Sequence, residues 1–478
     1  MNNSIKIDKA TARGSHGLAF AGLFLFTLLL YARPNEAFPD VFGTFPIVKI
    51  VAILTLAYYC LSKLVKGEPL TAWPLELKML MVIVLLAFAF IPIAEAPQDS
   101  YDVLFDVFLK VVAIFILMVN LLDTRERLVL LLKVVVIIGA VIAIFAIRSY
   151  ALGQIELDET KKFRIMGVIG GMFGNPNDMA TSFDLMLPLG VALALMHKGL
   201  QRAFYFACAG LIGAGVVASF SRAGFLGLLG MSAVLLWKVG RRNRALTALA
   251  FVIALGVFLT TMPGGYGDRI VSIFDPGKDA TGSRQARRDL LERAVKVAAA
   301  HPFIGVGIGN YHIYSHKELR AHNSYLEISA ELGVAGLIAY LILLFAPFRS
   351  LRRIERDVNG ETASSAPAAF ARGAPPPLRF NSERDREIYY LSVALQAAFV
   401  AYFICSSFAS IQYFWYIYYI IGFAVGLRVI HGARASVPDG ETAAASLAGG
   451  TLWKAPRRPV YADHRLDAAS RQITGPVH

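Results

Sequence analysis

Long apolar stretches recur along the chain, and they limit its fold more than any other feature. A helix needs roughly 20 mostly apolar residues to cross a hydrocarbon core of about 30 Å. Apolar residues make up 56% of the chain and charged residues 17%, against about 45–50% and 25% in soluble proteins. We therefore expect an all-α fold, a polytopic membrane helix bundle with about 12 transmembrane helices. The candidate spans are 17–31, 45–62, 76–94, 103–121, 127–147, 178–197, 203–218, 223–238, 244–261, 325–347, 388–407 and 411–430.

The distribution of Lys and Arg predicts the orientation of the bundle. The first stretch follows basic residues, as a signal peptide would, but no Ala-x-Ala cleavage site comes after it, so we interpret it as an uncleaved span. With the N-terminus inside, the short cytoplasmic loops and their margins hold ten Lys and Arg residues. They are Lys63, Lys66, Arg125, Arg127, Lys198, Arg202, Lys238, Arg241, Arg242 and Arg244. The short outer loops hold two, Arg33 and Arg222. Because cytoplasmic loops of membrane proteins are enriched in Lys and Arg, we expect both termini in the cytoplasm.

This orientation divides the chain into five parts. They are a cytoplasmic tail (1–16), helices 1–9 (17–261), a large outer loop (262–324), helices 10–12 with a cytoplasmic loop at 348–387 (325–430), and a disordered cytoplasmic tail (431–478). A shorter outer segment spans about 148–177. In the large loop, apolar residues recur at helical spacing before Pro302, which predicts an amphipathic helix packed over the bundle. The apolar residues are Leu290, Leu291, Ala294, Val295 and Ala298.

Cations on the outer side, where cations are scarce, are the first candidate functional residues. Arg222 lies in a turn between two spans with almost no loop, and Arg164 lies just before a glycine-rich segment. Arg284, Arg287 and Arg288 begin the amphipathic helix. An isolated arginine at a helix end is often a snorkelling residue. A cluster of guanidinium groups, however, suits an oxyanion such as a diphosphate, because each can donate two parallel hydrogen bonds. The net charge of +13 would also suit nucleic acid, but in a membrane protein anionic lipids or substrates come first.

His322 is the candidate general base. It lies at the outer mouth of the tenth span, where Asn323 and Glu327 fall one helical turn apart and can share a face. An imidazole can take a proton from a sugar hydroxyl near neutral pH. A solvated loop histidine is the plainer alternative, and His301 and His312 are equally outward.

Other site types are poorly supported by the sequence. Each of the three cysteines falls in an apolar run, which argues against a disulfide framework or a Cys-ligated zinc site. The outward carboxylates form no tightly spaced set for Mg²⁺ or Mn²⁺. The segment 305–310 is glycine-rich, but no strand precedes it, so we expect a tight turn and not a dinucleotide fingerprint. Lys110 and Asp184 lie deep within spans, where they could form a structural pair or a proton route, and we favour the structural pair.

The order of these motifs resembles the O-antigen ligase and polymerase family of bacterial envelope glycosyltransferases. The resemblance runs from about Arg164 to Leu337. Its pieces are weak singly and fairly specific as an ordered set, and the twelve-helix topology is similar to that of the ligase that joins O-antigen to lipid A-core. The chain lacks the tryptophan that many relatives carry in the loop helix, where Leu291 stands. The motifs are Gly174-Asn175-Pro176-Asn177, Ser221-Arg222-x-Gly224, His301-Pro302-x-x-Gly305-x-Gly307 and Ala321-His322-Asn323-x-Tyr325, followed by Glu331-Leu332-Gly333.

The resemblance implies glycan transfer on the periplasmic face of the bacterial inner membrane. The donor would be a glycan on undecaprenyl diphosphate and the acceptor a hydroxyl of lipid A-core, with membrane lipids and no nucleic acid as the other partners. No cofactor and no metal would be needed, and a single displacement would invert the anomeric carbon. The catalytic set that it implies is His322, Arg222 and Arg287 or Arg288. We place the substrate-binding residues around them: Arg164, Arg284, Asn323, Tyr325 and Asn177.

Several alternatives stay open at the sequence level. An O-antigen or exopolysaccharide polymerase would use a second lipid-linked glycan as acceptor, and a protein O-oligosaccharyltransferase would use a Ser or Thr hydroxyl. The absence of an added outer domain favours the ligase modestly. A transporter of lipid-linked glycan would need ionisable residues along a central path, but most of the candidates lie at the outer face. A scaffold that binds anionic lipid would leave His322 and Asn323 unexplained.

Overall fold

The computed structural model describes residues 16–34, 40, 46–152, 155–158, 162–165, 173–240, 283–315, 319–364, 380 and 382–434. Residues 1–432 form one compact unit, and the second, 433–478, lies almost entirely outside the described residues. Within the described part, nine helices are long and apolar enough to cross a membrane, and a shorter apolar helix precedes them. The prediction of an all-α, multi-pass membrane protein is confirmed. One two-stranded hairpin, which we did not expect, interrupts the helices.

Most of the helices lie close to the expected spans. The expected split between 203–218 and 223–238 is also found, since a turn of three residues separates the two helices. The expected span 244–261 lies outside the described residues. The helices are α1 (Gly17–Ala32), α4 (Ile47–Val65), α5 (Leu75–Phe90), α8 (Arg125–Ala151), α9 (Pro176–Met196), α10 (Gly199–Ala218), α11 (Arg222–Val239), α14 (Ser283–Ala300), α15 (Ser324–Ser364), α16 (Glu383–Ser406) and α17 (Trp415–Arg434).

Two spans differ in form from simple helices. The expected span 103–121 consists of α6 (Pro97–Tyr101), a π-helical turn η2 (Asp102–Phe108) and α7 (Leu109–Leu121). Helix α15 continues into the segment expected to be a loop, because Leu351, Ile354 and Val358 are buried at helical spacing beyond the span. The short elements that remain are η1 (Ile91–Ile93), η6 (Tyr311–Tyr314) and the antiparallel strands β1 (Ile155–Asp158) and β2 (Lys162–Ile165).

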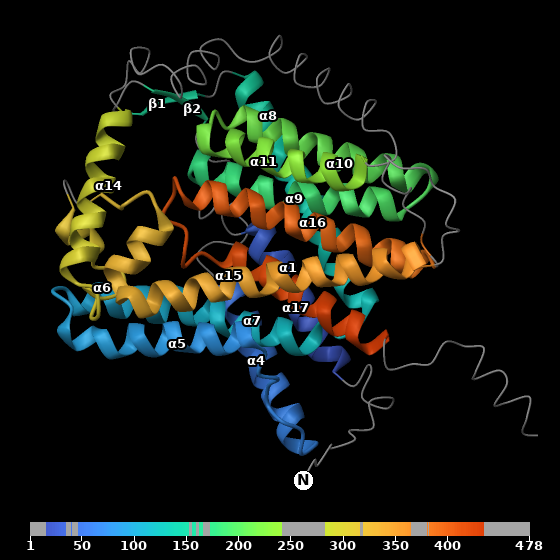
Figure 1. Ribbon diagram of the computed structural model, residues 1–478, viewed down its shortest axis with the longest axis horizontal. Helices are drawn as coiled ribbons and strands as arrows, with labels where there is room; N and C mark the ends of the chain where they lie inside the picture. The colour runs from blue at the N-terminus through green and yellow to red at the C-terminus, as the bar shows by residue number, and fades with distance from the viewer. Residues whose placement is uncertain are drawn as a thin grey trace, which may run out of the picture. The chain divides into compact units, whose positions relative to one another are not determined.

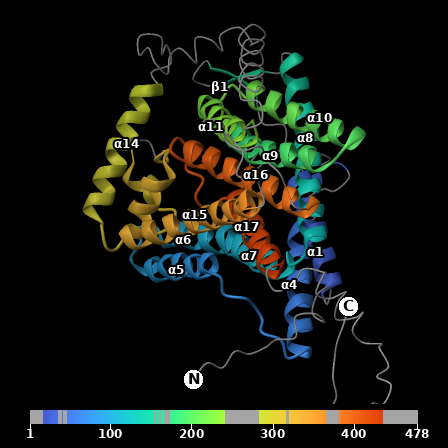
Figure 2. The ribbon, with the colours of Figure 1, turned by 45° about the vertical axis from the view of Figure 1, so that its right-hand side comes forward.

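Helix α9 lies at the centre of one half of the bundle. It packs against α10, α11 and α16, and α8 lies beside α9 and α10 (Figure 1). Small residues allow these close contacts: a Cβ at Gly190 would lie 3.2 Å from that of Ala209, a tight contact, and one at Gly224 would collide with the Cβ of Ala180 at 2.5 Å. Helix α17 fills the other half, where Gly422 packs on Met118 of α7. Helix α15 packs along α5 and α16, and α14 stands beside its first half (Figures 1 and 2).

Ion pairs between helices gather at one end of the bundle, which we call the basic end. Arg428 binds Glu76 through two hydrogen bonds of 2.7 and 2.8 Å, and Lys198 contacts Glu383 at 3.3 Å. The other pairs of this kind are Arg125 with Glu387 and Lys238 with Glu355. Three of these cations, Arg125, Lys198 and Lys238, belong to the set that we predicted to face the cytoplasm. The structure thus brings them to one end, opposite the end where α11 and α15 begin.

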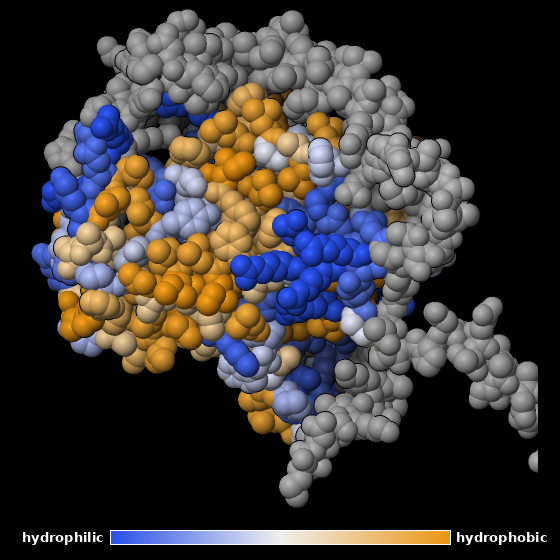
Figure 3. Space-filling model, viewed as in Figure 1, coloured by the Kyte–Doolittle hydropathy of each residue, from blue (hydrophilic) through white to orange (hydrophobic). Residues whose placement is uncertain are grey.

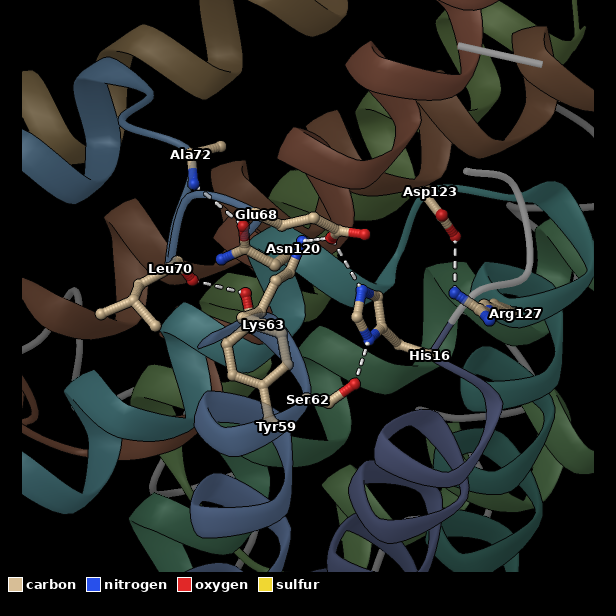
Figure 4. A network of polar contacts seen from close by, with 10 residues as sticks. All are labelled: His16, Tyr59, Ser62, Lys63, Glu68, Leu70, Ala72, Asn120, Asp123 and Arg127. Atoms are coloured by element: carbon tan, nitrogen blue, oxygen red, sulfur yellow. Dashed lines mark hydrogen bonds and ion pairs between the residues drawn. The ribbon is translucent and has the colours of Figure 1, made fainter. Parts of the chain in front are cut away.

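A polar network at the basic end ties the start of α1 to the end of α4 (Figure 4). Glu68 accepts from Lys63 Nζ at 2.7 Å and contacts His16 Nε2 at 3.0 Å. An ionised carboxylate can accept but not donate, so Nε2 carries a proton, and Nδ1 on the other side of the ring lies 3.1 Å from Ser62 Oγ. Hydrogen bonds from Lys63 and then His16 lower the pKa of Glu68 to about 2.

Replacing Glu68 with glutamine is expected to destabilise the protein by about 1 kcal/mol at neutral pH, since a partly exposed, doubly bonded carboxylate loses its charge. Because the folded-state pKa is depressed, the contribution of the carboxylate is complete above its ordinary value of 4.5. It is lost as the pH falls toward 2. Thermal unfolding in detergent should therefore be measured over a pH series. The difference in unfolding temperature between wild type and variant should decrease as the pH falls below about 4.5. Glu383→Gln, at an exposed pair, should change little. A gap that stays constant into acid would contradict this assignment.

The surface in Figure 3 is divided by hydropathy. It is mostly hydrophobic over α5 and the first half of α15, and hydrophilic over α14 and the far half of α15. Arg352, Arg353 and Arg356 are exposed on that far half. The hydrophobic face suits a lipid environment, and the arginines lie beyond the span on the side of Lys238 and Glu355.

The structural pairing of Lys110 with Asp184 is wrong. Lys110 contacts Asp106, one helical turn earlier, at 3.3 Å, and its side chain is half exposed. Asp184 is fully buried, and Cys405 Sγ lies 3.5 Å from its Oδ2. Hydropathy placed both residues within spans, but it gives no information on which helices are neighbours.

Candidate functional site

The first motif, Gly174-Asn175-Pro176-Asn177, starts helix α9. Asn175 is its N-cap and accepts a hydrogen bond of 2.9 Å from the backbone N–H of Asn177, while Pro176 takes the first helical position. The side chain of Asn177 is left to reach another helix. Its Oδ1 accepts from Ser221 Oγ at 2.9 Å. The first two motifs of the resemblance are therefore in direct contact.

The Ser221-Arg222-x-Gly224 motif starts helix α11. Ser221 is the N-cap and accepts from the N–H of Gly224 at 3.2 Å, so Arg222 is the first residue of the helix. Phe220 before it has the left-handed value φ 56°, which completes the sharp turn from α10. Gly224 lacks a side chain because Ala180 of α9 lies against it. The motif thus fixes a half-buried arginine at the end of the bundle opposite Lys238.

The Ala321-His322-Asn323 motif starts helix α15. Oδ1 of Asn323 accepts from the N–H groups of Tyr325 and Leu326, both at 3.0 Å. His322, just before this cap, is exposed and has φ 51°, a left-handed value that is costly for a residue with a side chain. The surrounding structure must hold the histidine in this conformation.

Glu327 holds that turn in place. Its Oε2 accepts from the backbone N–H of Ala321 at 3.0 Å and from the hydroxyl of Ser410, and its Oε1 accepts from Gln412 at 3.0 Å. The carboxyl group is 2% exposed, so these bonds form away from water, where they are strongest. The sequence suggested that Glu327 and Asn323 share a face, but not that Glu327 binds the loop before the helix.

The end of helix α16 brings the arginine turn and the histidine turn together. The carbonyl oxygen of Ala223, which follows Arg222, lies 3.5 Å from Cys405 Sγ. Nδ2 of Asn323, which follows His322, donates to the carbonyl oxygen of Ser407 at 3.2 Å. Both turns thus contact the same three-residue segment. Arg222 and His322 therefore belong to one end of the bundle.

Electrostatic attraction also links the histidine turn to the start of α9. Arg320, two residues before His322, lies within range to attract both Asp178 and Glu331. Asp178 follows Asn177 in the first motif, and Glu331 lies on α15 beyond Glu327. The segments 175–178, 221–224 and 320–325 thus surround the end of α16. We call this region the motif site.

A polar pocket of about 370 Å³ adjoins the motif site. It lies between the α6–η2 segment and the start of α15, and Tyr413 donates to Glu331 at 2.8 Å beside it. Besides Tyr413, the titratable residues that line it are four carboxylates with one arginine and one histidine. They are Asp99, Asp102, Glu327, Glu331, Arg320 and His312. Such a lining suits the hydroxyl groups of a sugar better than a diphosphate.

The loop helix α14 packs over α15 with a face that differs from the predicted one. Leu290, Ala294 and Val297 are buried, whereas Leu291 and Val295 are 41% and 50% exposed. Leu291 and Val295 belong to the predicted apolar stripe but lie outside the packed face, because the helix rests on a narrow cluster with Tyr311 and Ala321. The apolar pattern in the sequence of α14 is wider than the packed face, and the pattern alone does not show which of its residues contact the protein.

Helix α14 also carries the three loop arginines. Arg288 donates to Glu292 at 3.0 Å within the helix, and both side chains are exposed. For Arg284 and Arg287 the structure describes the backbone, at the first turns of α14. The backbone of Arg164 is in β2, directly opposite Glu156 of β1. The side chains of these last three arginines lie outside the description.

The motifs that contain Gly305 and Gly307 and that contain Gly333 have structural roles. The segment 305–307 runs along a break in α15 at Gly333, where φ is 68°: Val306 N–H donates to Ala330 at 2.9 Å, and Val334 N–H donates to Pro302 at 2.8 Å. A side chain at Gly305 would collide with the Glu331 backbone. Gly307 and Gly309 also have positive φ. The N–H of Asn310 donates to the carbonyl oxygen of Gly307 at 3.1 Å, so the segment 305–310 contains the predicted tight turn at its end.

The structure also shows the bonds of the expected substrate-binding residues. Oδ1 of Asn177 and both side-chain polar atoms of Asn323 are bonded within the protein, and Tyr325 accepts from Ser406 at 2.8 Å. Among the described residues, no group of three His, Cys, Asp or Glu side chains is placed to hold a metal ion. The three cysteines are free.

Comparison with known families now complements the geometry. Residues 207–341 match the family model described as O-antigen ligase. This segment belongs to the O-antigen ligase family. It includes the arginine turn, the loop helix, the His-Asn turn and the Gly333 break, so the family predicted from the motifs is confirmed. Residues 164–206, which include Asn177, precede the matched segment. No curated protein matches the chain.

Membership of this family gives the protein a general class. The helices make it a multi-pass membrane protein, and the match over residues 207–341 supports a glycosyltransferase of the O-antigen ligase and polymerase type.

Proposed function

We propose that the protein transfers O-antigen glycan from undecaprenyl diphosphate to a sugar hydroxyl of lipid A-core, at the periplasmic face of the inner membrane. The observation that carries the proposal is the meeting of the Arg222 turn and the His322 turn at the end of α16, opposite the basic end. Because the basic end is rich in Lys and Arg, it would face the cytoplasm together with both termini. The motif site would then face the periplasm.

The arginines would bind the donor. Arg222 and the loop arginines Arg284, Arg287 and Arg288, helped by Arg164, would hold the diphosphate and stabilise the charge that develops on it. Guanidinium groups that the protein already holds in position need little reorganisation during the reaction. Their stabilisation of the developing negative charge is therefore effective. This charge neutralisation would make the reaction independent of a metal ion.

His322 would activate the acceptor. As the acceptor hydroxyl attacks the anomeric carbon, its proton passes to the imidazole, and the bond from that carbon to the diphosphate oxygen breaks. The bonding electrons leave with undecaprenyl diphosphate. A single displacement of this kind inverts the anomeric carbon. The acidic pocket lined by Asp99, Asp102 and Glu331 is well suited to hold the acceptor sugar beside the base, through hydrogen bonds from its hydroxyl groups.

Asn177, Asn323 and Tyr325 would act by positioning. Oδ1 of Asn177, Nδ2 of Asn323 and the hydroxyl of Tyr325 bond Ser221, Ser407 and Ser406, so we assign these residues to the shape of the site. Glu327 joins them, since it fixes the backbone next to His322.

An assay with purified protein tests the function directly. Undecaprenyl diphosphate glycan is supplied with lipid A-core in buffer that contains EDTA, and both lipids are then separated. We expect labelled glycan on lipid A-core and one free undecaprenyl diphosphate for each transfer. Chain growth on the carrier would indicate a polymerase, and glycan on a Ser or Thr peptide would indicate a protein transferase. Loss of activity in EDTA that Mg²⁺ restores would contradict the metal-independent mechanism.

A further inference from the structure

The loop that follows α14 presents two large apolar side chains outward. Phe303 is 84% exposed and Ile304 is 55% exposed, whereas Gly305 and Val306 after them are buried. We call Phe303 and Ile304 the apolar tip. They stand at the two open positions of the motif His301-Pro302-x-x-Gly305, and the proposed reaction does not use them. Because exposed apolar surface of this size is unfavourable in water, the tip marks a contact with an apolar partner.

The backbone that carries the apolar tip is fixed against the break in α15. The carbonyl oxygen of Pro302 accepts from the N–H of Val334 at 2.8 Å, and proline itself has no N–H to satisfy. A Cβ at Gly333 would lie 2.8 Å from the carbonyl oxygen of Phe303, so the two backbones are in close contact. The tip is therefore held at the level of Gly333 and Val334.

The exposed residues of α15 indicate which part of this helix faces lipid. Between residues 324 and 348 every exposed residue is apolar, and the first exposed cation after them is Arg349. Roughly 20 helical residues cross a hydrocarbon core of about 30 Å, so counting back from Arg349 places the other edge of the core at about residue 329. Gly333 lies about four residues further in. At 1.5 Å per residue, the apolar tip is thus about 6 Å inside that edge.

The apolar tip continues the lipid-facing surface of α15. Val334 and Ile338, which are 44% and 52% exposed, lie one helical turn apart and therefore on one face. The hydrogen bond from Val334 to Pro302 places the tip beside the start of this face. In Figure 3 the surface over the first half of α15 is mostly hydrophobic, and the surface over α14 is hydrophilic. This continuity favours the acyl chains of the bilayer as the partner of the tip.

We propose that Phe303 and Ile304 insert among the acyl chains of the leaflet at the motif-site end and anchor α14 to the membrane. The loop starts on the last turn of α14, where the N–H of His301 donates to the carbonyl oxygen of Val297 at 3.0 Å. Helix α14 runs across α15 at a steep angle (Figures 1 and 2), so an anchor at its end holds it along the membrane surface. The inference does not depend on the transfer reaction.

Spin labels on the full-length protein in phospholipid vesicles test the depth of the apolar tip. Cys208 and Cys405 are buried, and Cys60→Ser removes the third native cysteine, so a single introduced cysteine can be labelled. The label is attached to Phe303→Cys or to Ile304→Cys. Its collision rate with oxygen, which concentrates in the bilayer, is then compared with its collision rate with a water-soluble nickel chelate.

The expected result is an oxygen-to-nickel collision ratio several-fold higher at the apolar tip than on α14. Glu292→Cys, at an exposed position of α14, is the control for water. Ile338→Cys is the matched control for lipid, because its exposure is close to that of Ile304 and it lies deeper in the span. The ratio at the tip should therefore fall between those of the two controls.

Phe303→Trp provides a second measurement without a label. The added emission, obtained by subtracting the emission of wild type, should be quenched by phospholipids with brominated acyl chains. Iodide in the water should quench it only weakly. The substitution keeps a large aromatic side chain at an exposed position, so the fold should be unchanged.

Three results would overturn the inference. A collision ratio at Phe303→Cys equal to that at Glu292→Cys, or strong quenching of Phe303→Trp by iodide, would place the tip in water. Dipolar broadening between labels on Phe303→Cys would show that a second copy of the chain covers the tip. Immobilisation of the label by added undecaprenyl diphosphate would assign the tip to the tail of a substrate. All of these measurements are made without an acceptor, so a failure of glycan transfer would not change them.

Discussion

Replacing His322 with asparagine is expected to lower the rate of glycan transfer by about 10²–10⁴, the usual contribution of a general base. The imidazole is exposed at the mouth of α15, where an acceptor hydroxyl can reach it. Asparagine lacks a basic nitrogen but tolerates the left-handed conformation that His322 adopts at φ 51°. This substitution removes the base and keeps the turn. Initial rates with saturating donor and acceptor measure the effect.

Two further variants separate chemistry from structure. His322→Ala should lose transfer to the same degree, since the base is again absent, although alanine adds strain at a positive φ. His301→Ala changes another outward histidine, whose ring packs against Tyr314, and should retain most of the activity. Binding of the lipid diphosphate should survive in all three. Near wild-type transfer by His322→Asn would rule out the histidine as the base.

The fold could be predicted from the sequence where one physical rule dominates. Apolar stretches of membrane-spanning length gave the positions of α4, α5, α8 and α9, because hydrophobicity alone decides whether such a segment enters a bilayer. The hairpin β1–β2 was missed, since its strands are four residues long and contain charged residues at Glu156, Asp158 and Lys162. Partners across the bundle were equally hidden. The contact of Asp184 with Cys405 joins residues 221 positions apart.

The candidate site was predictable in its parts but not in its assembly. The motifs identified Arg222 and His322, yet each motif begins a different helix, and it is the end of α16 that unites them. No pattern marked the segment 405–407 as their meeting point. The role of Glu327 was also hidden, because its partners Ser410 and Gln412 come from the loop before α17. The sequence can indicate a residue that caps its own helix. It does not indicate a carboxylate such as that of Glu327, which accepts hydrogen bonds from segments that are distant in the sequence.

The second large effect is expected at Arg222. Replacement with alanine should lower kcat/KM for the donor by about 10²–10³, the cost of removing one preorganised donor to a developing negative charge. It should also weaken binding of undecaprenyl diphosphate, which distinguishes it from the histidine variants. Arg222→Lys should recover part of the loss, because lysine supplies the charge without the planar fork. Donor titrations and binding assays with the purified protein measure both effects.

The position of Arg222 allows this test to distinguish a role in donor binding from a role in stability. A cation in the first turn of a helix faces the positive end of the helix dipole, an arrangement that costs about 0.3–1 kcal/mol. An arginine kept for stability would be better placed at the other end of α11, where Lys238 lies. We therefore expect Arg222→Ala to unfold at nearly the same temperature as wild type while transfer falls. Arg202→Gln, an exposed arginine in the first turn of α10, is the matched control and should change neither property. If Arg222→Ala unfolded far more easily and kept its affinity for the diphosphate, the arginine would belong to the scaffold and not to the donor site.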